Sequence, residues 1–538
     1  MQLSQSLRGR PIRFPRDTTP MADIYTDSTP RLAWLLLRWR LHSGVPRLVQ
    51  RKSFADGLVS LGVNADPSRV SRWESGSHRI PERVLFGYAE MLGLPAGHFT
   101  AIAHNLRSAI DPTTEPGSLL ITGIPETQPE LDALFSRMET HPVSGDAWIQ
   151  LAAAIDAGTY MYLPEAMWAD LVEKLLGELV RSVGIAHIQR LAASGVVARH
   201  LPAQRVMAKG IGRLVTTPAT RFVSPALMLF RDIVNPEVDS LLLRMASGPR
   251  GQVRRGASTT IASKVARGHF DENVLAELEA AMPDLLENRV GLHHPTDTVN
   301  ILAALDAPRQ QRILQQLEDR AGVPSLEETL RTGLSVPVDR SHKLASMIAR
   351  RATGMVAVAG ALTEADQMLV RLLEEALFHV HRERRYQAAL LLGASPFAEA
   401  LPTAIMGSLE TSDRYSTSRG LSLISFLDPK PEIAGQLLQW VLNSPQNWLK
   451  CRAMVALTPL GPHLGDAAQD SIASMIAASD DAEVLHTGLN LLGVISAPKL
   501  EMAVEGKPDG RAAAEWWREF GPVINETVQP RPQQADPA

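Results

Sequence analysis

The 538-residue sequence contains one cysteine, few aromatic residues and no long hydrophobic run. A single cysteine excludes a framework of disulfides and a zinc site built from several cysteines. The longest apolar stretches, near residues 32–37 and 355–362, are much shorter than the ~18 apolar residues that a membrane span needs. The N-terminus is rich in Arg and Pro and lacks the apolar core of a secretion signal. We therefore expect a soluble protein of the reducing cytoplasm that does not bind membranes.

The chain also lacks a strong excess of either charge, but its charges are unevenly distributed. Residues 1–110 hold 15 Lys and Arg against 8 Asp and Glu, whereas the rest of the chain holds 39 against 50. A basic N-terminal region on an acidic remainder indicates that only the N-terminal region meets a polyanion. Chance variation in surface charge is the alternative explanation.

Proline, glycine and apolar spacing predict an all-α protein with several parts. Residues 1–30, with four prolines, are expected to be a disordered basic arm, and residues 111–129, also with four prolines, a linker. No alternation typical of strands persists in the remainder. The predicted helices of the N-terminal region span residues 31–42, 54–61, 66–75, 81–92 and 95–110, and most of them end at a glycine. The predicted parts are an N-terminal helical domain (31–110), a middle helical domain (130–383), helical repeats (384–495) and a C-terminal helix with a disordered tail after Pro522 (496–538).

The third helix of the N-terminal region has the clearest sequence signals. Asp66 is a favourable N-cap, and Pro67 at the first helical position predicts a sharp helix start. Val70 and Trp73 are three residues apart and therefore share one face, which we expect to be buried. The helix should then present its other face to solvent.

Three polar residues lie near the start of that exposed face: Ser68, Arg69 and Arg72. A recognition helix presents side chains to base edges at this point, and the arginine fork can donate to O6 and N7 of guanine together. These residues are the predicted base-reading side chains. The predicted phosphate contacts, which lie before the second helix and after the third, are Lys52, Ser53, His78 and Arg79.

Two short segments carry a family resemblance: residues 70–76, with the sequence Val-Ser-Arg-Trp-Glu-Ser-Gly, and residues 88–94, with Tyr-Ala at the start and Leu-Gly-Leu at the end. They resemble the Cro/repressor-like (XRE) helix-turn-helix family. The resemblance covers about 80 residues and implies a compact DNA-binding domain whose third helix reads the major groove. By position, Ser68, Arg69 and Arg72 match recognition positions, and Trp73 and Glu74 match structural ones.

Two features depart from the family pattern, and an arm precedes the domain. The connection Val45–Ser53 is longer than usual, and the turn Val63–Asp66 is about two residues longer, so the recognition helix could be displaced. Arg8 and Arg10, in an Arg-Gly-Arg-Pro sequence, resemble the core of an AT-hook that inserts into the minor groove. A nonspecific phosphate-binding arm is the alternative, as is translation from Met21, which would remove the arm.

The C-terminal part contains an internal repeat. Segments beginning at residues 386, 418, 451 and 486 align at spacings of 32, 33 and 35 residues. Their third position is always small, and their seventh is always branched and aliphatic, which suits close helix crossing over a shared core. The pattern resembles degenerate HEAT-type repeats and predicts an α-solenoid; an irregular helical bundle is the alternative. The aligned residues are Ala388, Gly420, Ala453 and Gly488, and Leu392, Ile424, Leu457 and Leu492.

We find no phosphate-binding loop, no nucleophile elbow and no metal-ligand set in the sequence, so we expect no catalysis, cofactor or metal. The preferred hypothesis is a nucleoid-associated, sequence-specific regulator that binds double-stranded DNA. Its helical body would form a homo-oligomer or bind a protein or small-molecule effector. The alternatives are an α-solenoid interaction scaffold with a vestigial helix-turn-helix and, less favoured, an enzyme with an unrecognised site.

Overall fold

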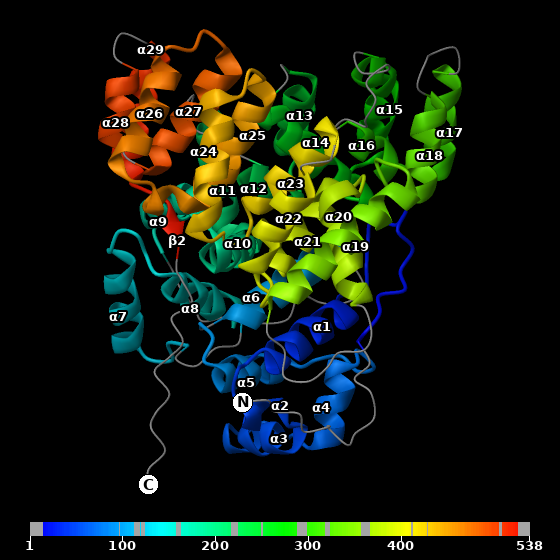
Figure 1. Ribbon diagram of the computed structural model, residues 1–538, viewed down its shortest axis with the longest axis vertical. Coiled ribbons are helices and arrows are strands. Elements are labelled where there is room, and N and C mark those ends of the chain that lie inside the picture. The colour runs from blue at the N-terminus through cyan, green and yellow to red at the C-terminus, as the bar shows by residue number, and fades with distance from the viewer. Residues whose placement is uncertain are drawn as a thin grey trace.

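In the computed structural model the described residues fold mainly into helices, with very little strand, which confirms the all-α prediction (Figure 1). The described residues are 14–95, 97–111, 119, 124–157, 163–216, 224–248, 251–287, 298–317, 323–356, 366–409, 413–427, 429–495, 497–504 and 508–525. Two short parallel strands, β1 (Ser182–Val183) and β2 (Ile524–Asn525), join segments far apart in sequence.

Six helices, which we call the head, lie at one end of the molecule (Figure 1). They are α1 (Ser28–Leu41), α2 (Pro46–Val49), α3 (Arg51–Ser60), α4 (Pro67–Glu74), α5 (Glu82–Leu92) and α6 (His98–Ile110). The predicted helix-ending glycines Gly44, Gly62, Gly76 and Gly93 all have positive φ, as a glycine-terminated helix requires. The connection predicted to be long contains α2, and α3 begins at Arg51 rather than at Phe54.

The prediction of a disordered arm over residues 1–30 is wrong for residues 14–30. Phe14 packs with Leu37 and Leu41 of α1, and Asp17 forms a buried ion pair with Arg31. Sequence composition missed this because the segment has few apolar residues and is held by polar contacts to distant helices. Residues 1–13, including Arg8 and Arg10, lie outside the described residues.

The middle of the chain is built from helices and one 3₁₀ helix. They are α7 (Gln128–Met138), α8 (Gly145–Asp156), α9 (Glu165–Arg181), α10 (Gly184–Arg199), α11 (Leu201–Thr216), α12 (Ser224–Met228), η1 (Leu229–Asp232), α13 (Pro236–Ser247), α14 (Gln252–Ala266), α15 (Glu272–Glu287), α16 (Val299–Ala304), α17 (Ala307–Gln316), α18 (Val323–Thr332) and α19 (Val338–Met355). Helix α10 packs on α8, α9 and α11, and also on α6 of the head. Head and remainder, which we call the body, therefore share one hydrophobic core.

The C-terminal helices pack in consecutive pairs. They are α20 (Gln367–Phe378), α21 (Arg382–Gly393), α22 (Ala400–Leu409), α23 (Arg414–Ile424), η2 (Pro431–Ile433), α24 (Ala434–Asn443), α25 (Asn447–Leu457), η3 (Thr458–His463), α26 (Asp466–Ala477), α27 (Ala482–Ile495), α28 (Ala497–Ala503) and α29 (Pro508–Phe520). α20 packs on α21, α22 on α23, α24 on α25 and α26 on α27. The aligned segments mark the second helix of each pair, so the predicted boundary at 383/384 falls inside α21 and separates it from α20.

The small and aliphatic columns of the repeat are buried in the structure. A Cβ on Gly420 would lie 2.9 Å from Leu409 of α22, and one on Gly488 would lie 2.4 Å from Ile476 of α26. In both pairs the small residue therefore lets the first helix cross close to the second. All four aliphatic residues of the seventh position are buried.

The predicted linker and tail are packed at some of their described residues. Within the linker Pro125 is buried, whereas residues 126–129 are exposed and α7 already begins at Gln128. Asp111 and Leu119 are buried, and the Asp111 carboxylate accepts hydrogen bonds from the backbone N–H and hydroxyl of Ser28. The remaining linker residues before 124 lie outside the described residues. Val523 and Ile524 are buried and Ile524 pairs with Ser182, so the expected disorder after Pro522 is wrong for residues 523–525. Two helices, α28 and α29, replace the one expected before the tail.

Candidate nucleic-acid interface

Helix α4 begins where the sequence predicts. The Asp66 carboxylate caps it by accepting hydrogen bonds from the backbone N–H groups of Ser68 (2.7 Å) and Arg69 (2.8 Å). The Arg69 N–H, followed by that of Ser68, holds the pKa of Asp66 below its usual value. Pro67 occupies the first helical position. The cap and the proline therefore fix the start of α4 and keep Asp66 ionised at neutral pH.

The inner face of α4 is buried, as predicted for Val70 and Trp73. The adjacent Glu74 is also buried and holds α4 to three other helices of the head. Its carboxylate accepts hydrogen bonds from Arg40 of α1 (2.8 Å) and from the Tyr88 hydroxyl of α5 (3.1 Å), and Arg51 of α3 lies 3.5 Å away.

Electrostatics strengthen this arrangement around Glu74. Burial alone would lower the pKa of Arg40, but the Glu74 charge outweighs it and raises that pKa. Burial, with Glu74 beside it, raises the pKa of Tyr88 well above its usual value. Arg40 is therefore cationic and Tyr88 is a neutral donor, so a buried carboxylate with matched donors sets the position of α4.

The outer face of α4 carries the predicted base-reading residues. Ser68 and Arg72 are exposed, and no described residue of the body covers them. Arg69 is half-exposed and folds back on its own turn, because its Nη1 donates to the Asn64 carbonyl oxygen (2.9 Å) and its Nε lies 3.6 Å from Asp66. Arg72 is thus the most open cation of this face, and Arg69 must leave its turn to reach a base.

The four predicted phosphate-binding residues lie on both sides of α4. The sequence predicts that Lys52 and Ser53 precede the second helix, but in the structure they lie in the first turn of that helix, α3. His78 and Arg79 follow α4 and are exposed, with Arg79 3.9 Å from Glu82. Lys52 and Ser53 therefore lie at a helix N-terminus, where backbone N–H groups and the helix dipole favour a phosphate.

No protein-family model matches the chain, and no curated protein matches it either. None of the helices within the described ranges is long and apolar enough to cross a membrane. Among the described residues no group of three or more His, Cys, Asp or Glu is placed to hold a metal ion.

Composition overstates the positive charge at the surface of the head. Arg31, Arg38, Arg40 and Arg107 are all buried, and each is paired with a carboxylate. Arg38 donates to Asp366 of the body, with its Nε 2.8 Å from Oδ2. These arginines connect and stabilise the head, and the cations left for a polyanion lie mainly around α3 and α4.

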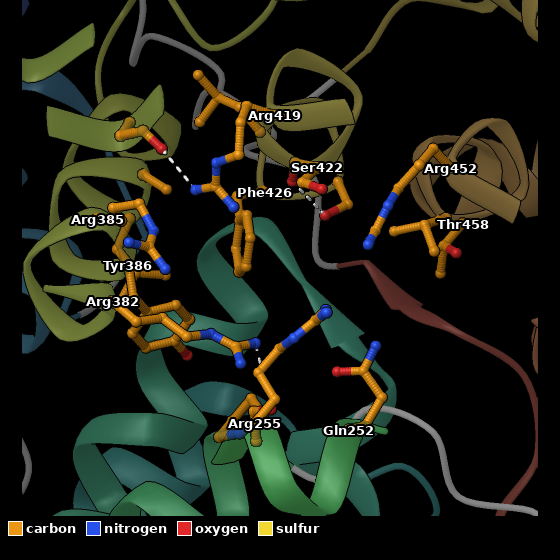
Figure 2. Close-up of a pocket in the computed structure, with 18 of the residues that line it drawn as sticks. Gln252, Arg255, Arg382, Arg385, Tyr386, Arg419, Ser422, Phe426, Arg452 and Thr458 are labelled. Atoms are coloured by element: carbon orange, nitrogen blue, oxygen red, sulfur yellow. Dashed lines mark hydrogen bonds between the residues drawn. The ribbon is translucent and has the colours of Figure 1, made fainter. Parts of the chain in front are cut away.

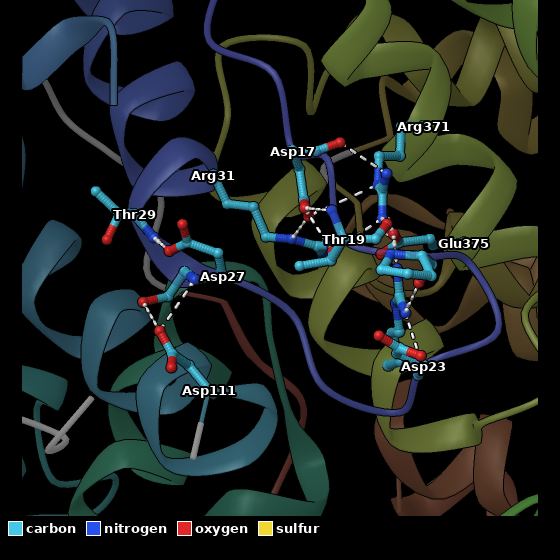
Figure 3. Close-up of polar contacts among 12 residues, drawn as sticks. Asp17, Thr19, Asp23, Asp27, Thr29, Arg31, Asp111, Arg371 and Glu375 are labelled. Carbon is cyan, nitrogen blue, oxygen red and sulfur yellow. Dashed lines mark hydrogen bonds and ion pairs between the residues drawn. The ribbon is translucent and has the colours of Figure 1, made fainter. Parts of the chain in front are cut away.

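The junction between head and body is a buried ion network that the sequence analysis did not anticipate (Figure 3). Arg31 of α1 donates to Asp17 (2.8 Å) and to Glu375 of α20 (2.7 Å). Glu375 also accepts from Arg371 (3.1 Å) and from Arg384 of α21 (2.7 Å). Burial would raise the pKa of Glu375, but Arg31 and Arg384 outweigh it and hold that pKa well below its usual value. No local pattern signals a pair separated by 344 residues.

Proposed function

We propose that the protein is a sequence-specific regulator that binds double-stranded DNA through a helix-turn-helix formed by α3 and α4. The observation that carries the proposal is the outer face of α4, which exposes Ser68 and Arg72 at one end of the molecule while Glu74 fixes the inner face. A recognition helix needs this combination of a rigid inner face and an open polar outer face.

The dimensions of α4 suit the major groove. An α-helix with its side chains is about 10–12 Å in diameter, and the major groove of B-DNA is about 12 Å wide, so α4 can lie along the groove. Arg72 is placed to read a guanine, and Ser68 and Arg69 lie one turn nearer the N-terminus. Lys52 and Ser53 at the start of α3, with His78 and Arg79 beyond α4, supply phosphate contacts on either side.

The paired helices from α20 to α27 support an α-solenoid body of HEAT-like repeats. Solenoids commonly present long surfaces to partners, and we propose that this body forms a homo-oligomer or receives an effector. A dimer would place two copies of α4 about 34 Å apart, one helical turn of DNA, on a palindromic site. In this proposal the protein regulates transcription at the nucleoid, in the cytoplasm, and catalyses no reaction.

A scaffold with a vestigial helix-turn-helix is the second candidate. It is favoured by the internal use of Arg31, Arg38, Arg40 and Arg107, which reduces the positive charge facing outward, and by the contact of Arg69 with its own turn. Under this reading the chain binds a protein partner through its paired helices and selects no DNA sequence.

Selection from random duplexes with the full chain separates the two functions. We expect enrichment of a defined site by the wild type, and a loss of enrichment in the Arg69→Ala/Arg72→Ala double variant. The matched control is Arg205→Ala/Arg350→Ala, which removes two exposed arginines of the body and should leave enrichment intact. No enriched sequence, or equal enrichment by wild type and the α4 variant, would contradict the proposal.

A further inference from the structure

A cavity of about 580 Å³ lies in the body, between the repeat helices and the middle of the chain. One wall is formed by α21, α23 and α25, and the opposite wall by α14 and the segment around β1 (Figure 2). Its size falls within the ~300–1,000 Å³ typical of small-molecule sites. None of the residues singled out in α4 contributes to it.

The charged side chains in the described lining of this cavity are all positive. Arg382, Arg385, Arg414, Arg419 and Arg452 line it from the repeat helices. Arg181, Arg254 and Arg255 line it from the opposite wall, and no Asp or Glu belongs to the described lining. This contrasts with residues 111–538, in which 50 acidic residues outnumber 39 basic ones. Every cation of the lining is an arginine, the residue whose planar fork matches phosphate oxygens.

Several of these arginines are oriented by backbone carbonyl groups. Arg419 donates to the carbonyl oxygens of Leu377 (2.8 Å) and Ala376 (3.1 Å), and Arg385 donates to that of Val380 (2.9 Å). Such bonds fix the direction of a guanidinium. In Figure 2, Arg255, Arg382, Arg419 and Arg452 extend from different helices into the same space.

Arg181 is a buried cation of this cavity with an unsatisfied hydrogen-bond donor. It is 5% exposed, its Nη1 donates to the Pro522 carbonyl oxygen (2.8 Å), and its Nε has no hydrogen-bond partner among the described residues. Burial lowers the pKa of Arg181 to about 10, which still leaves it cationic at neutral pH. An anion inside the cavity would satisfy this unmet donor and offset the buried charge of Arg181.

We propose that this cavity binds a small molecule with at least two phosphate groups, of the size of a nucleoside diphosphate. The guanidinium groups bind the phosphates, with hydroxyls such as that of Ser422 beside them. Tyr386, Tyr415 and Phe426, which also line the cavity, provide apolar and aromatic surface for the rest of the ligand.

The cavity is connected to the head through α21. Arg382 and Arg385 of this helix line the cavity, whereas Arg384 faces the other way and binds Glu375, the partner of Arg31 in α1. An effect of the ligand on DNA affinity rests on the proposed function. Binding itself does not, so it is tested without DNA, and failure of one proposal is distinguishable from failure of the other.

Calorimetry with the full chain tests the binding, with ADP, pyrophosphate and adenosine as probes. We expect ADP to bind with a dissociation constant below about 100 μM, and adenosine to bind at least a hundredfold more weakly. Equal affinities for pyrophosphate and ADP would indicate that the ligand is an inorganic polyphosphate, and a higher affinity for ADP would indicate a nucleotide. In either case the phosphate claim stands.

Arg255→Gln and Arg452→Gln, on opposite walls, should each weaken binding at least tenfold. The control Arg350→Gln, an exposed residue of α19 outside the cavity, should not. Circular dichroism of each variant shows whether it is folded, and the second variant carries the test if the first is not. Absence of binding by ADP and pyrophosphate at about 1 mM would overturn the proposal. Undiminished affinity in both folded variants would overturn it too, as would binding of a short oligonucleotide at this cavity in place of the small molecules.

Discussion

Glu74 provides the most demanding test of how α4 is held. Its side chain is 1% exposed and that of its partner Arg40 is 2% exposed, so solvent does not screen the pair. Glu74→Gln removes the negative charge but keeps the size of the side chain and an oxygen for Tyr88. Removing one partner of a buried ion pair costs about 3–5 kcal/mol, because the remaining charge stays buried.

Hydrogen exchange of the peptide covering α4 measures this loss locally. A decrease of about 3–5 kcal/mol in the free energy of opening predicts roughly 10²- to 5 × 10³-fold faster exchange, up to the limit at which α4 stays open. The double variant Arg40→Met/Glu74→Met removes both charges and should regain most of the protection. DNA affinity should fall in Glu74→Gln although no outward-facing side chain of α4 has changed.

The control is Glu328→Gln in α18, which removes half of an exposed ion pair with Arg331. Exposed pairs contribute at most about 1 kcal/mol, so exchange in α18 should change less than about fivefold. If Glu74→Gln leaves the exchange of α4 unchanged, the carboxylate does not set the position of the helix and the reasoning is refuted.

Three further perturbations test the junction and the repeats. Asp366→Ala removes the carboxylate that accepts hydrogen bonds from Arg38 and Trp34 (2.8 Å each). The free energy of unfolding, measured by urea titration, should fall by about 3–5 kcal/mol. An unchanged midpoint would show that the ion pair between Arg38 and Asp366 is not needed for stability. Gly488→Ala places a Cβ 2.4 Å from Ile476 and should lower the stability of the protein by about 1–3 kcal/mol. The control Gly212→Ala in α11, which has open space around it, should not lower it. Equal melting temperatures for the two variants would argue against close packing of α26 on α27. Burial lowers the pKa of His98, whose Nε2 lies 3.0 Å from the Ala394 carbonyl oxygen, from 6.5 to about 4, so the unfolded chain binds a proton first as pH falls. His98 therefore contributes about 3 kcal/mol to the loss of stability between about pH 6.5 and pH 4, and His98→Gln should lose less stability than wild type over this range by about that amount; equal losses would contradict the assignment.

Local signals in the sequence predicted local structure well. The Asp66 cap, the buried face with Val70 and Trp73, and the positive-φ glycines follow from rules that operate within a few residues. The predicted close helix crossing at the small residues of the repeat is also present at Gly420 and Gly488, which each face the preceding helix of their own pair.

Features that depend on distant residues could not be predicted in this way. The segment with Asp17 reads as disordered because its order depends on Arg31 and Arg371, and Arg31 in turn needs Glu375. The net charge of the head is misleading partly for the same reason, since Arg31 and Arg38 have carboxylate partners in the body. The predicted boundary at residue 383 divides the first helix pair because the repeated sequence pattern marks only the second helix of each pair. The arginine cavity collects residues from segments more than 200 positions apart, and no single motif marks it.

The central claim is that α4 reads bases, and the affinity of wild type and Arg72→Ala for matched operators tests it most directly. The operators are the selected site and variants of it changed at one base pair at a time. If Arg72 reads a guanine, its removal costs about 1–3 kcal/mol on the selected site and abolishes discrimination at one base pair only. A uniform loss across all operators, or no loss at all, would contradict the claim.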